Sequence, residues 1–314
     1  MTVCIASPYP LSDLKGNSVT AKRIAEILNE AGYKARSSHG YDGLPADALI
    51  SLHAKKGAQA VFDFQKNQPQ GKSIVLLTGT DIYDDFPNGR GFESLEIADH
   101  IAITHAESIP MVPERFREKL IIVPSSLTMP AIQAAPVCPP YKVSAISIVG
   151  HLRPVKRSFL TIEAVAKHPE WDVEVWQLGE ALDDESAATA RAWEKKDARY
   201  RWLGGLPRDE ALQKTAESAL TVNSSILEGG ANAVLEAMTM GVPILASEIP
   251  GNIGLLGRNY PGYFKGEEIE SKLDQILAQP EQLKTWVDSA TDRLPIFSRE
   301  SEREAWLKIL SQEA

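Results

Sequence analysis

Short apolar runs alternate with amphipathic helical patterns along most of the chain. The runs that read as strands cover residues 2–7, 48–54, 73–78 and 100–104 in the first part, and 143–150, 173–179, 199–204, 219–224 and 242–247 in the second. Helical patterns or turns separate them, and the first helix is expected from about Asn17 to Ala31. This alternation predicts an α/β fold with parallel sheets whose two faces are covered by helices.

A proline-rich stretch divides this pattern into two halves. Prolines occupy positions 124, 130, 136, 139 and 140, and proline removes a backbone donor and interrupts helices and strands. A chain of 314 residues also exceeds one ordinary core. We therefore predict two doubly wound, Rossmann-like domains, residues 1–135 and 141–295, that face each other across a cleft. The amphipathic stretch from about 296 to 314 is predicted to be a helix that packs back on the first domain.

Composition excludes several classes of partner. The formal net charge is 33 − 42 = −9, which argues against a broad surface for nucleic acid or anionic membranes. Cys4 and Cys138 are the two cysteines, and they form no zinc or disulfide pattern. The first residues lack the basic start and apolar run of a signal peptide, and no apolar stretch is long enough to cross a bilayer. A cytoplasmic protein is expected; its oligomeric state is not predicted.

The stretch SILEGGANAVLEAMTMGVPILAS, residues 225–247, places two acids around a glycine pair at the start of a helix. Glu228 lies in the loop after a predicted strand, Gly230 or Ala231 is expected to open the helix, and Glu236 lies two turns further on. A helix N-terminus with unpaired N–H groups suits a diphosphate, and carboxylates accept hydrogen bonds from sugar hydroxyls. A nucleotide sugar combines both groups. The alternative is a capped helix with an incidental glutamate in the loop.

A second loop, in VGHLRPVKRSF, offers Arg153, Lys156 and Arg157 after a predicted strand. A departing diphosphate needs cations at such a place, although a basic loop in solvent is the default interpretation of this segment alone. The chain contains no Asp-x-Asp, the motif of a metal-bound diphosphate, so no metal and no cofactor are predicted.

The first half places polar residues after three of its predicted strands, where parallel strands bring ligand-binding loops together. Backbone donors and cations in these loops suit a small anion. The candidates for binding it are Gly16, Asn17, Arg23, Lys55, Thr80 and Asp81, with His53 as a candidate catalytic residue. For His53 and Lys55 a purely structural role is the alternative.

The second half resembles a known family. SSILEGGANAVLEAMTMGVPILAS resembles the Glu-x7-Glu signature of the retaining, two-domain (GT-B) glycosyltransferases of family 4, and VGHLRPVK resembles their donor-phosphate loop. The resemblance implies that Glu228 lies by the donor sugar, that Glu236 holds the ribose hydroxyls and that Lys156 contacts the diphosphate. The family has an arginine where this chain has His151, so Arg153 is the candidate to supply that charge. The other expected donor-binding residues are Gly229, Gly230, Ala231, Asn232, Trp202 and Leu203.

A narrower resemblance concerns the substrates. The blocks GNSVTAKR, DGLPADALISLHAKK, LTGTDIYDDF, RYRWLGGLPR and IPGNIGLLGRNYPGYF resemble the selenosugar synthases of selenoneine biosynthesis. This implies a transfer from a UDP-sugar, UDP-N-acetylglucosamine or UDP-glucose, to selenophosphate. Two alternatives stay open: a family 4 hexosyltransferase that acts on a hydroxyl acceptor, with His53 or Asp81 as base, and a sugar-nucleotide-binding protein without activity.

Overall fold

The computed structural model describes every residue except 14, 15, 133, 135–141 and 312–314. The chain divides into two compact units. Unit 1 comprises Met1–Ser126 and Ile296–Ala314, and unit 2 comprises Leu127–Pro295. Cys138 and the prolines at 136, 139 and 140 lie outside the described residues. No helix in the described ranges has the length and apolar character to cross a bilayer.

Unit 1 contains one six-stranded sheet in the order β2-β1-β3-β4-β5-β6, and every neighbouring pair is parallel. Its main elements are β1 (Thr2–Ser7), α1 (Gly16–Glu30), β2 (Lys34–His39), β3 (Ala48–Leu52), α2 (Ala58–Asn67), β4 (Lys72–Leu76), α3 (Glu93–Ile97), β5 (His100–Ile103), β6 (Leu120–Ile122) and α11 (Arg299–Ser311). The helix α1 thus begins one residue before the expected Asn17.

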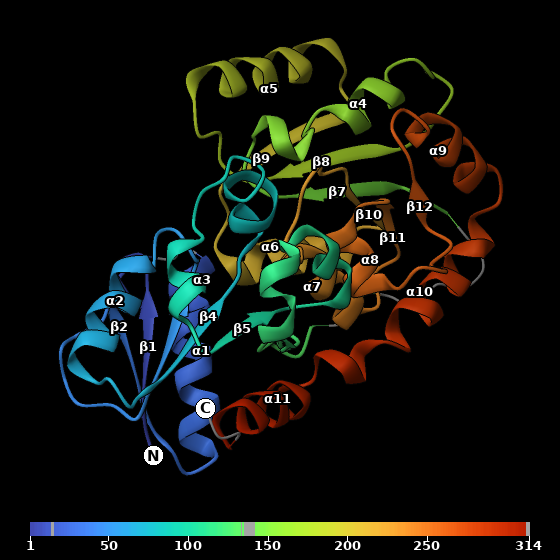
Figure 1. Cartoon of the computed structure of the whole chain (residues 1–314). Coiled ribbons are helices and arrows are strands. Elements are labelled where there is room, and N and C mark those ends of the chain that lie inside the picture. Colours follow the sequence, from blue (N-terminus) through green and yellow to red (C-terminus); the bar gives the residue numbers. More distant parts are fainter. Residues whose placement is uncertain (14–15, 133, 135–141, 312–314) are drawn as a thin grey trace. The chain divides into compact units, whose positions relative to one another are not determined.

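Helices cover both faces of this sheet because its strands alternate between two apolar cores. Leu49 belongs to the core under α2 and α3, and its neighbour Ile50 belongs to the core under α1 and α11. Trp306 and Ile309 of α11 are fully buried in the second core. Figure 1 shows α11, in red, beside α1, in blue. The C-terminal helix therefore belongs to unit 1.

The boundary between the units lies at Ser126, earlier than the expected residue 135. The backbone N–H of Ser126 donates to the carboxylate of Glu302 over 2.7 Å, which fixes this point of the chain to α11. Two residues later, the carbonyl of Thr128 accepts a hydrogen bond from Arg208 of unit 2 over 3.1 Å. Side-chain contacts on either side of Leu127 thus define the boundary, and the proline pattern alone did not reveal them.

Unit 2 contains a second parallel sheet, in the order β12-β11-β10-β7-β8-β9. Its elements are β7 (Ala145–Val149), α4 (Leu160–Val165), β8 (Glu174–Leu178), α5 (Asp184–Lys196), β9 (Tyr200–Gly204), α6 (Arg208–Glu217), β10 (Leu220–Asn223), α7 (Asn232–Met240), β11 (Ile244–Ser247), α8 (Pro250–Leu256), β12 (Tyr263–Phe264), α9 (Ile269–Ala278) and α10 (Leu283–Thr291).

Three strands were not predicted, and each has a physical reason. β2, with the sequence KARSSH, lies at the sheet edge, is half-exposed and is too polar to show an apolar run. β6 and β12 are edge strands of three and two residues. Such short segments carry no measurable period, so only pairing with a neighbouring strand identifies them.

The strand order brings particular loops together at the carboxyl edge of each sheet. In unit 2, β7 and β10 are neighbours although far apart in sequence, so the loop that contains Lys156 adjoins the loop that contains Glu228. In unit 1, β3 and β4 are neighbours, and they are followed by His53 and by the turn with Asp81. Ligands of open parallel sheets bind at such places.

Candidate functional site

The two loops at the carboxyl edge of the unit 2 sheet are held together by hydrogen bonds. The N–H of Ile226 donates to the carbonyl of Val155 over 2.8 Å, and Ser224 Oγ donates to the carbonyl of Lys156 over the same distance. In return, Arg157 Nε donates to the carbonyl of Ser224. The guanidinium of Arg157 is thereby committed to the backbone. The two loops form one preorganised surface rather than two independent segments.

Lys156 and Glu228 form an ion pair across these loops. Lys156 Nζ contacts Glu228 Oε1, and Ser225 Oγ donates to the same oxygen over 2.7 Å. The side chains retain 20% and 14% of their exposure, so a ligand can reach both of them. The expected cation and the first acid of the signature are thus neighbours. A diphosphate and a sugar hydroxyl offer each charge a replacement partner.

Residues of β11 and α8 pack against the Glu228 loop and hold it in place. A Cβ at Gly251 would lie 2.1 Å from the Glu228 carbonyl oxygen, so only glycine permits α8 to approach this loop. Ser247 Oγ donates to the carbonyl of Ser225 over 2.6 Å, and Asn252 Nδ2 donates to the carbonyl of Ser247 over 2.9 Å. The sequence analysis did not single out these supports, since only folding brings them to Glu228.

The helix α7 begins at Asn232, one or two residues later than expected. Ala231, buried and extended, precedes it, and Gly230 has a φ of +135°, which favours glycine. Gly229 and Gly230 therefore belong to the loop that leads from Glu228 to the helix. The first turn of α7, where a helix presents N–H groups to an anion, follows the glycines directly.

Glu236 lies on the second turn of α7, and its side chain is 16% exposed. Arg208, the first residue of α6, donates to Glu236 Oε1 from Nε over 3.3 Å and from a terminal nitrogen over 3.2 Å. Burial raises the pKa of the Glu236 carboxyl, and the charge and hydrogen bond of Arg208 oppose that rise. Arg208 was missed by sequence reasoning, although it ends the quoted block RYRWLGGLPR.

The remaining predicted donor-side residues occupy several different environments. Arg153 is exposed and lines a pocket of about 480 Å³ together with Glu163 and Asp183, whereas Glu228 is not among the lining residues. His151 accepts a hydrogen bond at Nδ1 from the N–H of Glu180 over 3.2 Å. The structure thus places Lys156, and not Arg153, against Glu228; the roles of Arg153 and His151 toward a donor stay predictions.

Trp202 and Leu203, which are among the expected donor-binding residues, lie on β9 and are half-buried. Trp202 Nε1 donates to the carbonyl of Gly179 over 2.9 Å. That bond fixes the indole ring against the end of β8. The role of Trp202 and Leu203 toward a donor stays a prediction.

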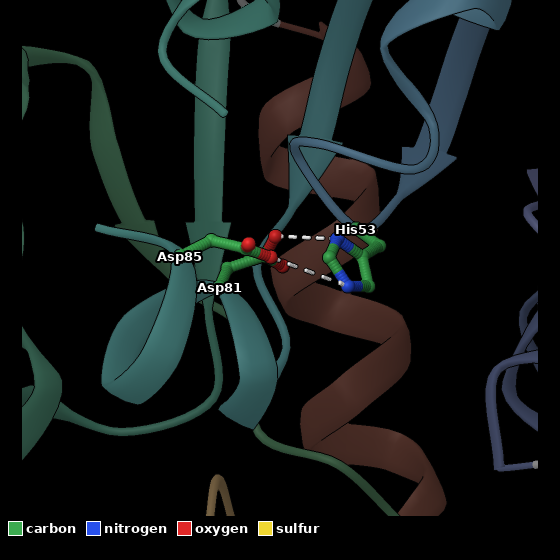
Figure 2. A group of neighbouring side chains, drawn as sticks. All are labelled: His53, Asp81 and Asp85. Carbon is green, nitrogen blue, oxygen red and sulfur yellow. Dashed lines mark ion pairs between the residues drawn. The ribbon is translucent and has the colours of Figure 1, made fainter. Parts of the chain in front are cut away.

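In unit 1 a buried polar network follows β3 and β4. Figure 2 shows His53 with its ring facing the carboxyl groups of Asp81 and Asp85. His53 Nδ1 lies 2.5 Å from Asp81 Oδ1, and Nε2 lies 3.9 Å from Asp85 Oδ2. The exposure of the three side chains is 2% or less. Sequence reasoning named His53 and Asp81 as site residues, but it did not predict that they would be buried together.

Hydrogen bonds tie this network together. His53 Nδ1 and Asp81 Oδ1 are 2.5 Å apart, so the two side chains share a hydrogen bond. The N–H and Oγ1 of Thr78 donate to the other oxygen of Asp81 over 2.8 and 3.0 Å. His53 has a φ of +73°, a strained conformation for a residue with a side chain. The network thus holds His53 in a backbone conformation that it would not adopt alone.

Lys55 and Arg90 supply the charges that balance Asp85. Lys55 Nζ lies 3.0 Å and Arg90 Nε lies 3.2 Å from Asp85 Oδ1. Among the described residues, His53, Asp81 and Asp85 are the one group of three whose ligand atoms are close enough to hold a metal, all within 4.8 Å of one another. Because cations and hydrogen-bond donors already surround both carboxylates, the group is accounted for without an ion.

The predicted anion-binding residues of unit 1 have mostly structural partners. Arg23 is buried, and its guanidinium lies 3.2 Å from Glu302 and 2.7 Å from Ser125 Oγ. Lys55 pairs with Asp85 rather than facing solvent alone. Thr80 is exposed, and Gly16 and Asn17 form the start of α1, as the anion hypothesis requires. The acceptor assignment stays a prediction, and its strongest cation, Arg23, already neutralises a buried acid.

Comparison with known proteins shows which family the donor-side half of the chain is similar to. Residues 140–293, just under half of the chain, match the family model Glycosyl transferases group 1. The matched range lies within unit 2, so this unit is similar to a glycosyltransferase group 1 domain. The matched range contains the Lys156 and Glu228 loops and Glu236. Glycosyltransferase 1 domain-containing protein 1 of Xenopus tropicalis is 26% identical in an alignment of length 308, with 88% of this chain and 88% of that protein covered.

Solved structures of low sequence identity share the whole fold. Sucrose-phosphate synthase of Thermosynechococcus elongatus has a TM-score of 0.79 at 12% identity, with 98% of each chain covered. Anabaena HepE in complex with UDP-glucose has a TM-score of 0.75 at 13% identity, with 99% of this chain and 100% of HepE covered. These structures confirm the expected GT-B fold of two Rossmann-like domains. The glycosyltransferase class is supported by the family match of residues 140–293.

Proposed function

We propose that this glycosyltransferase moves a sugar from a UDP-sugar to selenophosphate and so provides a selenosugar for selenoneine biosynthesis. The donor half of the proposal depends on one observation above all: the Lys156–Glu228 ion pair in the loops that precede α7, with Glu236 on the second turn of that helix. The fold neighbour HepE has been solved with UDP-glucose. UDP-N-acetylglucosamine and UDP-glucose are the proposed donors.

In this proposal the bound UDP-sugar separates Lys156 from Glu228 and becomes the new partner of each. The diphosphate takes Lys156 Nζ and the N–H groups at the start of α7, and Glu228 is released to accept hydrogen bonds from the sugar hydroxyls. Glu236 accepts bonds from the ribose hydroxyls. Lys156 then stabilises the negative charge that develops on the departing UDP. Because this cation comes from a side chain, no metal ion is proposed, and excess chelator should leave the rate unchanged.

Selenium is the attacking atom at the acceptor. It forms a bond to the anomeric carbon as the bond from that carbon to the UDP oxygen breaks, and UDP leaves with the electron pair. The products are UDP and a Se-glycosyl selenophosphate, from which water releases the selenosugar at the P–Se bond. The selenosugar synthase resemblance supports this acceptor. Because selenium is strongly nucleophilic, the reaction depends on positioning more than on a base.

A hydroxyl acceptor is the second candidate, and one observation favours it. The short contact between His53 Nδ1 and Asp81 leaves Nε2 of His53 as the nitrogen without a hydrogen-bond partner in the described structure. An oriented histidine of this kind is the usual general base for a hydroxyl group. In this structure, however, His53 is buried.

One assay separates these functions. The protein is incubated with UDP-N-acetylglucosamine or UDP-glucose, either with selenophosphate or with a panel of simple alcohols and sugars, and the products are identified by mass spectrometry. A selenium-containing sugar formed together with UDP supports the proposal. A glycosylated hydroxyl compound without any selenium product supports the second candidate. Binding of UDP without turnover of any acceptor would leave a sugar-nucleotide-binding protein.

A further inference from the structure

Arg208 contacts only one of the two carboxylate oxygens of Glu236. Nη2 and Nε of Arg208 contact Oε1 of Glu236, at 3.2 and 3.3 Å, and no described residue forms a hydrogen bond with Oε2. The glutamate is therefore held through one oxygen, and the other oxygen is left for a ligand. A pair formed only for stability would gain more from a bidentate contact, in which each oxygen receives its own N–H.

Arg208 has further partners besides Glu236. The same terminal nitrogen lies 3.1 Å from the carbonyl oxygen of Thr128 and 3.5 Å from Met129 Sδ. These contacts belong to the segment that begins unit 2. With the side chain of Arg208 still 52% exposed, such an anchor is what keeps its guanidinium in place. Exposed ion pairs without one contribute little.

We propose that Arg208 is a positioning residue for the donor: anchored on Thr128, it holds the Glu236 carboxylate ionised and oriented so that Oε2 receives the ribose hydroxyls. This inference rests on the proposed function, because it assumes that Glu236 binds ribose. Arg208 acts through Glu236 and does not touch the reacting atoms.

The charges around Glu236 assign this task to Arg208. Other charged side chains on α6 and α10, the charged helices packed against α7, pair with each other: Lys214 with Glu217 and Lys284 with Asp288. Asp209 and Glu210 of α6 are exposed, and α8, β10 and β11 carry no charged residue. Arg208 is the charged group that opposes the rise of the Glu236 pKa caused by burial. Without it, Glu236 would take up a proton at a higher pH.

Calorimetric titration with UDP at a series of pH values tests the inference. Four proteins are compared: the wild type, Arg208→Ala, Arg208→Lys and the control Arg201→Ala. Arg201 is an arginine of unit 2 with a similarly exposed side chain, 58% against 52% for Arg208, and it pairs with a different acid, Glu174, over 2.6 Å. Affinities are expressed relative to the wild type at the same pH, so that protonation of UDP itself cancels.

The expected result is specific to a positioning role. Arg208→Ala should lose about tenfold in UDP affinity at neutral pH, the effect of one weakened charged hydrogen bond, and the loss should grow as the pH falls. Arg208→Lys should recover most of the affinity, and Arg201→Ala should match the wild type. In a Glu236→Gln background, Arg208→Ala should cause no further pH-dependent loss.

Two results would overturn the inference and leave the proposed function standing. One is unchanged UDP affinity in Arg208→Ala; the other is a loss that is independent of pH and persists in the Glu236→Gln background, which would indicate direct contact between Arg208 and UDP. If the wild type does not bind UDP, the proposed function fails and the inference fails with it.

Discussion

Both sheets carry paired ionisable side chains at their carboxyl edges, but the side chains are partly exposed in unit 2 and buried in unit 1. In unit 2, Lys156 and Glu228 form a pair in which each side chain keeps 14% to 20% of its exposure. In unit 1, His53, Asp81 and Asp85 form a network with exposures of 2% or less. Both groups lie after neighbouring parallel strands, where such folds bind ligands. Position in the fold is therefore the same, and accessibility is what distinguishes them.

This difference in exposure decides whether a charged side chain can exchange its partner for a ligand. The two ions of a partly exposed pair can separate and bind a ligand instead at low cost, because each ion is partly solvated during the exchange. A buried network cannot, since removing one member leaves an uncompensated group inside the protein. We therefore expect changes at the unit 2 edge to alter donor binding and turnover, and changes at the unit 1 edge to alter stability first.

The largest expected effect is on the folding of unit 1. Asp81→Ala removes the acceptor of His53 Nδ1 and of both Thr78 donors, and it should lower the free energy of unfolding by about 3–5 kcal/mol. Urea denaturation measures this change. The matched control is Asp84→Ala, on the same turn but 60% exposed, which should have an effect within about 0.5 kcal/mol. Equal effects of the two variants would contradict the buried-network account.

A large loss of turnover is expected from Lys156→Ala, at nearly unchanged stability. This variant removes the side-chain cation beside Glu228 and should lower kcat about 100- to 1,000-fold, the effect of losing one preorganised donor to a departing oxyanion. Steady-state assays with a UDP-sugar measure it. The control is Lys142→Ala, which removes an exposed lysine that pairs with Asp172. This variant should keep wild-type kcat. A Lys156→Ala enzyme with full kcat would remove the proposed role.

A smaller effect is expected on nucleotide affinity. Glu236→Ala should weaken UDP binding by about 1–3 kcal/mol, since the lost bonds join a charged acceptor to ribose hydroxyls. Calorimetry with UDP alone detects the loss because the ribose is part of UDP. Uridine should show the same loss as UDP, and inorganic diphosphate should show none. If uridine binds the variant and the wild type equally well, Glu236 does not hold the ribose.

The smallest effect concerns stability and has the opposite sign. Burial raises the pKa of Glu236, so the folded state favours its neutral form. Stability from this group is fully present below its unfolded pKa and is lost as the pH rises through the higher folded pKa. At neutral pH, Glu236→Gln should therefore be slightly more stable than the wild type while it binds UDP more weakly. Thermal unfolding at neutral and acidic pH checks this, and a less stable variant at neutral pH would contradict it.

The sequence predicted the sheets better than it predicted the partners within them. Fully buried strands such as β3 and β4 show as apolar runs, and the glycines before α7 mark a loop that approaches a helix start. Contacts between distant residues leave no such local pattern. The bond from Arg208 to Glu236 spans 28 positions, and the pair of Arg23 with Glu302 spans 279. Such partners emerge only from strand order and helix packing.

The burial of His53 shows the same limit at a single residue. Its place after an apolar strand suggested a catalytic histidine or a structural one, and the local sequence did not distinguish them. The distinguishing feature is the turn Asp81–Asp85: two of its three aspartates, Asp81 and Asp85, face the imidazole. That turn follows a different strand, so the parallel pairing of β3 with β4 decides the environment of His53.

A crystal structure with bound UDP tests the central claim most directly. The account predicts that the ribose hydroxyls contact Glu236, that the diphosphate contacts Lys156 Nζ and the first N–H groups of α7, and that Lys156 and Glu228 have separated. The network of His53, Asp81 and Asp85 should be unchanged. An intact Lys156–Glu228 pair with the diphosphate bound elsewhere would contradict the claim that this ion pair is the donor site.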